Sequence, residues 1–107
     1  MKRRRLVVAG SALLDLKEIY RLVRLNASPV TARRYVGRIR RFLRGLTTAS
    51  ERGNSHDDIY RGLRSAGFEG RVQVAFEITD AEVTVVRIFF AGQDWLDHLR
   101  SRRDGQR

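Results

Sequence analysis

The sequence predicts an α+β domain, in which a helical hairpin packs on one face of a small antiparallel sheet and a short helix follows. Apolar residues recur at helical spacing in the first half of the chain and alternate with polar ones over residues 71–79. A chain of 107 residues, 42% of them hydrophobic, can bury one modest core, so we expect a single domain over residues 1–107. The expected element order is β-α-α-β-β-β-α.

The first predicted elements are a strand and a helix. Residues 1–4 form a basic lead, and the apolar run at residues 6–9 is expected to be a strand. Gly10 interrupts this run. Ser11 is a favourable N-cap, so we expect it to begin a helix over residues 12–25.

A second helix is predicted over residues 29–46. Ser28 and Pro29 stand at its N-cap and first helical position, where both residue types are favoured. The short link to the first helix predicts a hairpin whose apolar faces share a core. The polar segment over residues 47–58 is expected to be a loop, in which His56 is solvated.

The second half predicts strands and a final helix. Residues 83–90 are apolar on both faces, which is typical of a central strand. The expected elements are a strand over residues 59–64, a turn or irregular crossing over 65–70, strands over 71–79 and 83–90, a helix over 93–102 and a frayed tail over 103–107.

The charge of the chain is unevenly distributed. The formal net charge is +10, and residues 1–50 hold 13 basic and 2 acidic side chains, a balance of +11. Six arginines and no acidic residue lie between residues 28 and 50. Such a surface favours a polyanionic partner: nucleic acid, a nucleic-acid machine or an acidic protein.

Composition narrows the class of protein further. The chain has no cysteine, which excludes disulfides and thiol chemistry and suits the cytoplasm, where we expect the protein. Its two histidines are far apart, so we expect no metal site and no cofactor. No apolar run approaches the ~20 residues of a membrane span, so we expect no membrane partner.

Four stretches, in this order and spacing, resemble a known family. They are residues 11–20, 60–64, 67–76 and 85–95. In the last and most specific, an arginine followed by apolar strand residues, Arg87-Ile88-Phe89-Phe90, leads into the turn Gly92-Gln93-Asp94-Trp95. Together they resemble the RelE/ParE superfamily of type II toxin–antitoxin toxins, also called plasmid stabilisation proteins, and its ParE-like branch in particular. The resemblance covers about residues 5–100.

The resemblance implies a compact α+β toxin that an antitoxin holds inactive. RelE-like members cut mRNA on the ribosome, whereas ParE-like members bind DNA gyrase. The implied partners are a cognate ParD-like antitoxin with an acidic, partly disordered C-terminal segment, in a toxin–antitoxin hetero-oligomer, and gyrase as the target.

The residues favour the ParE-like hypothesis over the nuclease. Metal-independent RNA cleavage needs acid–base groups and cations around one phosphate. RelE-like members take these from Lys and Arg of the sheet and from a Tyr or His near the C-terminus. Here the last predicted helix has no tyrosine, the predicted strands after the helices have no lysine, and Gln93 replaces the family's turn arginine. A nuclease would have to use Arg71, Arg87 and His98, and His98 is more simply a surface partner of Asp94.

The leading hypothesis is therefore a gyrase-inhibiting toxin without catalytic residues, and the alternative is a RelE-like ribosome-dependent mRNA endonuclease. A non-toxic nucleic-acid-binding module is a third possibility. Arg87 is expected to share a face with Val83, Val85 and Phe89, and either to pair with Glu77 or Glu69 or to line a concave site with Arg64 and Arg71. Trp95 is expected to anchor the core. The candidate residues for antitoxin or target binding are Arg34, Arg38, Arg41, Arg61, Arg64, Arg71, Arg87, Gln93 and Trp95.

Overall fold

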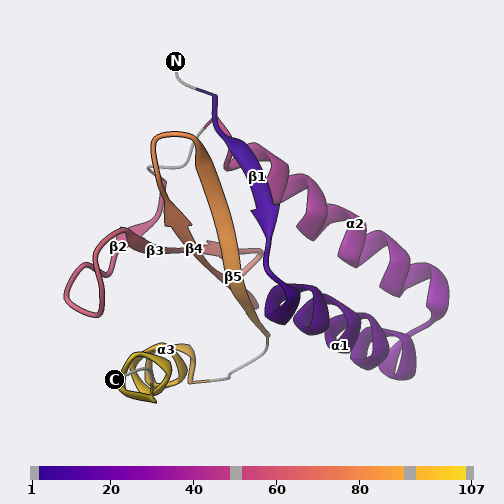
Figure 1. Ribbon diagram of the computed structural model, residues 1–107. Coiled ribbons are helices and arrows are strands. Elements are labelled where there is room, and N and C mark those ends of the chain that lie inside the picture. Colours follow the sequence, from indigo (N-terminus) through magenta and orange to yellow (C-terminus); the bar gives the residue numbers. More distant parts are fainter. Residues whose placement is uncertain (1–2, 49–51, 91–93, 106–107) are drawn as a thin grey trace.

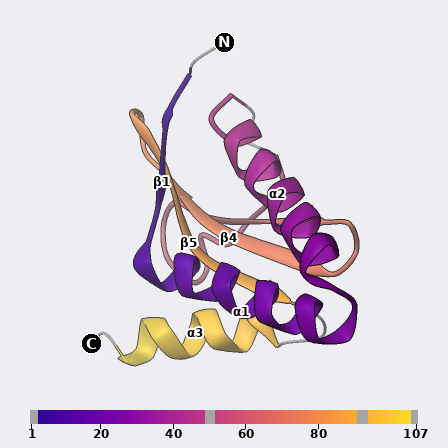
Figure 2. The same cartoon turned by 90° about the vertical axis from the view of Figure 1, so that its right-hand side faces the viewer.

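The computed structural model describes residues 3–48, 52–90 and 94–105 and places a helical hairpin on one face of a five-stranded sheet (Figure 1). A third helix packs against the other face of the sheet, and Figure 2 shows it running below the first helix of the hairpin. The elements are β1 (Arg5–Val8), α1 (Gly10–Asn26), α2 (Pro29–Gly45), β2 (Asn54–Ser55), β3 (Leu63–Phe68), β4 (Val72–Ile78), β5 (Glu82–Phe90) and α3 (Trp95–Gly105). The predicted α+β class and the predicted hairpin are confirmed.

The sheet is mixed, and this corrects the expectation of an antiparallel one. Its strand order is β1-β5-β4-β3-β2, and β1 runs parallel to β5, with Arg5 opposite Glu82 and Val8 opposite Val85. The other pairs are antiparallel. No tight turn joins β1 to β5, because the helical hairpin and three strands lie between them in sequence; their relative direction is therefore not fixed by a hairpin.

The third strand lies later in the sequence than predicted. The expected strand over 59–64 and turn over 65–70 are wrong, because β3 occupies Leu63–Phe68 and the turn follows it. Glu69 and Gly70 have φ of 51° and 75°, the left-handed conformation that hairpin turns require. Gly67 and its small neighbours, which suggested a turn, are extended strand residues. In addition, β2 lies within the predicted loop and pairs with the start of β3.

A β-bulge in β5 changes which side chains share a face. Ala75 pairs with Arg87 and Phe76 with Val85, so Val86 has no partner in the register. Val85 accordingly lies in the core under the hairpin, whereas Val86 lies in the core under α3. The expectation that Arg87 shares a face with Val83 and Val85 is therefore wrong.

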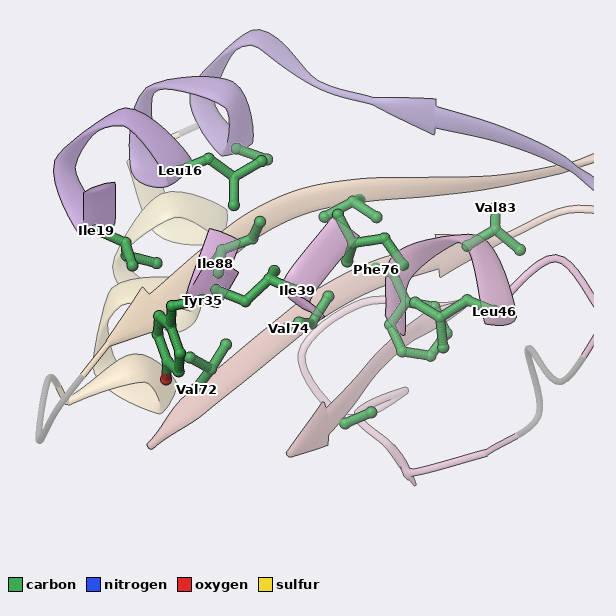
Figure 3. Close-up of a cluster of buried hydrophobic side chains, with 14 residues drawn as sticks. Leu16, Ile19, Tyr35, Ile39, Leu46, Val72, Val74, Phe76, Val83 and Ile88 are labelled. Atoms are coloured by element: carbon green, nitrogen blue, oxygen red, sulfur yellow. The ribbon is translucent and has the colours of Figure 1, made fainter. Parts of the chain in front are cut away.

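Two hydrophobic cores lie on opposite faces of the sheet. In the larger one, Leu16 and Ile19 of α1 point toward Ile88 of β5, and Ile39 of α2 packs beside them (Figure 3). The smaller core joins α3 to the sheet through Leu99, which is buried. Its other buried members are Ile59, Leu63, Ala75, Val86 and Phe89.

The two hairpin helices begin differently. Ser28 caps α2 as predicted: its hydroxyl oxygen accepts a hydrogen bond from the Thr31 amide at 3.1 Å. The predicted Ser11 cap is wrong, because α1 begins at Gly10 after Ala9. The Ser11 hydroxyl instead donates to the carbonyl of Val86 at 2.7 Å, which ties the helix to the bulge of β5. Among the described residues, no helix is long and apolar enough to cross a membrane.

Candidate functional site

The arginines of α2 form a basic surface. All six arginines of the helix are exposed: Arg33, Arg34, Arg38, Arg40, Arg41 and Arg44. Five of them surround Gly37 and line a shallow depression, which we call the arginine hollow: Arg34, Arg38, Arg40, Arg41 and Arg44. The structure thus brings together the predicted residues Arg34, Arg38 and Arg41.

Within the described part of the chain, Arg38 is the member of the hollow with an acidic partner. Its Nε and a terminal nitrogen donate to the two carboxylate oxygens of Glu69 at 2.8 and 3.1 Å, and its guanidinium lies 5.1 Å from the centre of the Tyr35 ring. The hydrogen bond from Arg38 lowers the pKa of the Glu69 carboxyl. The partner comes from the β3–β4 turn and not from α2, so part of the charge of the helix is balanced within the fold.

An apolar groove lies beside the hollow, between the two helices of the hairpin. Leu13 and Leu14 of α1 line it and are 41% and 66% exposed. Tyr20 and Val36 also line it, together with two cations, Lys17 and Arg40. We call this the hairpin groove. It offers exposed apolar surface next to positive charge.

Arg87 has a partner that neither sequence hypothesis named. Its Nε and a terminal nitrogen donate to the Asp15 carboxylate at 2.7 and 3.1 Å. The same carboxylate accepts the backbone N–H of Ile88 at 2.8 Å. Because β1 pairs with β5 only as far as Val85, Asp15 satisfies the strand edge where β1 has ended. The predicted ion pairs of Arg87 with Glu77 or Glu69 are wrong.

The predicted concave site of Arg64, Arg71 and Arg87 does not form. Arg64 donates to the carbonyl of Gly53 at 3.1 Å, near the start of β3, whereas Arg71 follows the far end of that strand. Arg71 instead borders a groove of about 690 Å³ between α1 and the end of β5. The apolar residues that line this groove include Ile19, Leu22, Ile88 and Phe90, and its acidic residues are Asp15 and Glu18.

The residues of the nuclease alternative are only partly brought together. The guanidinium of Arg87 lies 4.9 Å from the centre of the Phe89 ring, and the exposed ring of His98 lies 5.7 Å from it. Arg71 borders the groove beside α1. The hydrogen bond between His98 and Asp94 is from amide to carbonyl, at 3.1 Å. The Asp94 carboxylate lies near Asp97 and raises its pKa.

His56 was expected to be solvated and is instead half-buried. Its Nε2 lies 2.7 Å from the hydroxyl of Ser65, which is 1% exposed, and its ring meets Trp95 edge-on at 5.3 Å. Trp95 packs against the smaller core, as predicted. Sequence spacing gave no indication of this contact because Ser65 was assigned to a turn. Arg61 is exposed, and Gln93 lies outside the described residues.

Comparison with known proteins gives a match to a family model and matches to solved structures. Residues 6–95 match the family model described as the ParE toxin of the type II toxin–antitoxin system, parDE. The fold is similar to a chain in the solved structure of the chromosomal ParDE TA system from P. aeruginosa, with a TM-score of 0.72 and 21% identity over 83% of this chain and 97% of that chain. No curated protein matches the sequence.

Proposed function

We propose a target and a partner for this chain, which belongs to the ParE toxin family of type II toxin–antitoxin systems. The proposed target is DNA gyrase, whose inhibition blocks replication. The proposed partner is a cognate ParD-like antitoxin that holds the toxin inactive in a hetero-oligomer in the cytoplasm. The family match over residues 6–95 is the observation that carries the proposal.

The arrangement of the nuclease candidates supports gyrase over mRNA as the target. RNA cleavage requires acid–base groups and cations that converge on one phosphate. Arg71 borders the groove beside α1, His98 lies on α3 against Phe89, and Arg87 is bonded to Asp15. Inhibition by binding needs no such convergence.

The hairpin groove is the proposed binding site of the antitoxin's C-terminal segment. A segment that folds on binding must bury apolar surface to offset its lost entropy, and the exposed Leu13 and Leu14 offer that surface. Lys17 and Arg40 at the same groove complement acidic side chains. The arginines of α2 adjoin this groove, so an antitoxin bound there is proposed to block the access of the target to them.

Two variants of α1 test the antitoxin binding site. Leu14→Glu places a negative charge in the groove, which repels an acidic segment and removes apolar surface, and should weaken antitoxin binding at least tenfold. Leu25→Glu is the matched control, because Leu25 is on the same helix, is 64% exposed against 66% for Leu14, and does not line the groove. Equal affinity of the two variants for the antitoxin would contradict the proposed binding site.

Gyrase supercoiling of relaxed plasmid tests the target. Titrated toxin should inhibit supercoiling or accumulate cleaved DNA, and stoichiometric antitoxin should restore the reaction. Undisturbed supercoiling at large toxin excess would overturn the gyrase proposal and leave the antitoxin proposal to its own test.

A further inference from the structure

Gly37 stands in the middle of α2, where packing does not explain it. A glycine inside a helix costs about 0.5–1 kcal/mol relative to alanine. A Cβ added at Gly37 would meet nothing within 4 Å, so no neighbouring atom requires its absence. What the missing side chain creates is the floor of the arginine hollow. Gly37 therefore leaves space between the guanidinium groups in which an anion can bind.

Four guanidinium groups of the hollow have no partner within the described part of the chain. Arg34, Arg40, Arg41 and Arg44 form no ion pair or hydrogen bond between side chains there, unlike Arg38 with its Glu69. They are all exposed, and repulsion between like charges on one helix face is destabilising. An anion from outside the chain would relieve this repulsion.

The lining of the hollow favours a rigid polyanion over a flexible acidic peptide. It consists of arginines and Gly37 and has no apolar side chain, in contrast to the hairpin groove with its two exposed leucines. A disordered peptide that becomes ordered here would gain charge contacts but no apolar burial to offset its lost entropy. A duplex nucleic acid is already ordered, and its phosphates suit the forked guanidinium group.

We propose that the arginine hollow of α2 binds the phosphodiester backbone of duplex DNA, without reading its sequence. The choice of DNA rests on the proposed function, because gyrase acts on duplex DNA. From Arg34 to Arg44 the helix rises about 15 Å, since each residue adds about 1.5 Å, and this length spans about four phosphates at 3.4 Å of duplex axis each. The toxin thus contacts the DNA on which its target works.

The number of phosphate contacts sets the expected salt dependence. Four arginines that each replace a counterion give a slope of about −3.6 in log K against log salt, so affinity falls about 150-fold between 50 and 200 mM salt. Removing three of them leaves a slope of about −0.9 and a fall of only about 3- to 4-fold over the same range.

The test measures binding of a short fluorescent DNA duplex of arbitrary sequence by anisotropy, with gyrase absent. The test variant is Arg34→Gln/Arg41→Gln/Arg44→Gln. The matched control removes the same charge elsewhere, as Arg3→Gln/Arg24→Gln/Arg100→Gln, three exposed arginines outside α2. Glutamine is a good helix former, and a circular dichroism spectrum checks that both variants keep their helices.

The expected result is that the α2 variant loses at least tenfold in affinity at low salt and most of its salt slope, while the control keeps most of both. Equal losses in the two variants would overturn the proposal, as they would show only a response to net charge. So would tighter binding of a duplex RNA of the same length, or of polyglutamate, through the same arginines. DNA binding without gyrase inhibition would refute the proposed target alone, and gyrase inhibition without α2-dependent DNA binding would refute the inference alone.

Discussion

The hydrogen bonds of Asp15 provide the sharpest prediction about how this fold is held together. Its carboxylate accepts two bonds from Arg87 and one from the amide of Ile88, and thereby joins α1 to the end of β5 beyond the last residue paired with β1. Asp15→Ala removes all three bonds and leaves a strand amide and a guanidinium without their acceptor.

The expected cost is about 2–3 kcal/mol in the free energy of unfolding. A hydrogen bond to a charged group contributes about 1.5–3 kcal/mol, but the side chains of Arg87 and Asp15 retain 27% and 16% exposure, so water replaces part of the loss. For a chain of 107 residues this corresponds to a decrease of roughly 10 °C in Tm. Asp15→Asn keeps one acceptor and should lie between wild type and alanine.

The assay is urea unfolding at neutral pH, with Glu18→Ala as the control on the same helix. Glu18 pairs with Arg21, but the two side chains are 52% and 55% exposed, so water and salt screen the pair and it contributes little to stability. If Asp15→Ala destabilised the protein no more than Glu18→Ala, the reasoning that Asp15 anchors the strand edge would be refuted.

Three further predictions concern single side chains. Gly37→Ala should raise the free energy of unfolding by about 0.5–1 kcal/mol, because alanine has the higher helix propensity and its Cβ would meet no atom within 4 Å. In contrast, Gly53→Ala should lower the free energy of unfolding, because its Cβ would lie 2.1 Å from the carbonyl oxygen of Ser65. Urea unfolding measures both changes. Tyr35→Phe should stabilise the protein by about 1 kcal/mol, because the buried Tyr35 hydroxyl has no hydrogen-bond partner among the described residues. Burial also raises the pKa of Tyr35 above its ordinary 10.0, so the wild type, unlike the variant, should lose stability as the pH rises through that raised value; parallel losses would contradict this. The hydrogen bond from Arg38 lowers the pKa of Glu69, so this pair stabilises the fold above the ordinary pKa of 4.5, and the stabilisation is lost as the pH falls through the lowered value. The difference in urea midpoint between wild type and Glu69→Gln should therefore shrink on acidification. A difference that stays constant would contradict the ion pair as its cause.

The sequence predicted best what short-range chemistry determines. Ser28 and Pro29 identify the start of α2 because a capping hydroxyl and a fixed φ act within one helical turn. The alternation over residues 71–79 located β4 because side-chain direction in a strand has a period of two. The family resemblance was carried by the order of such local patterns and is confirmed by the family match.

What the sequence could not give depends on contacts between distant segments. The partner of Arg87 lies 72 residues away on α1, and no local pattern pairs them. The bulge at Val86 reverses the face of the residues before it relative to those after it, so simple alternation misplaced Arg87. His56 was assigned to solvent because its loop is polar, although β3 brings Ser65 against it.

The candidate surface was predicted in part. The arginines of α2 were recognised from charge alone, because a helix that carries six arginines and no acid exposes most of them. The proposed role of Gly37 was not recognised from the sequence. That role depends on the position of Gly37 among the arginines that line the hollow, which only the folded helix shows. The exposed leucines of the hairpin groove were not identified from the sequence, because their exposure depends on how the two helices pack.

The most direct test of the central claim divides one preparation of purified toxin between two reactions: gyrase supercoiling of relaxed plasmid, and mRNA cleavage on programmed ribosomes. Supercoiling should be inhibited, the cognate antitoxin should relieve the inhibition, and the mRNA should stay intact. Uninhibited supercoiling, together with cleavage of mRNA on the ribosome, would contradict gyrase as the target.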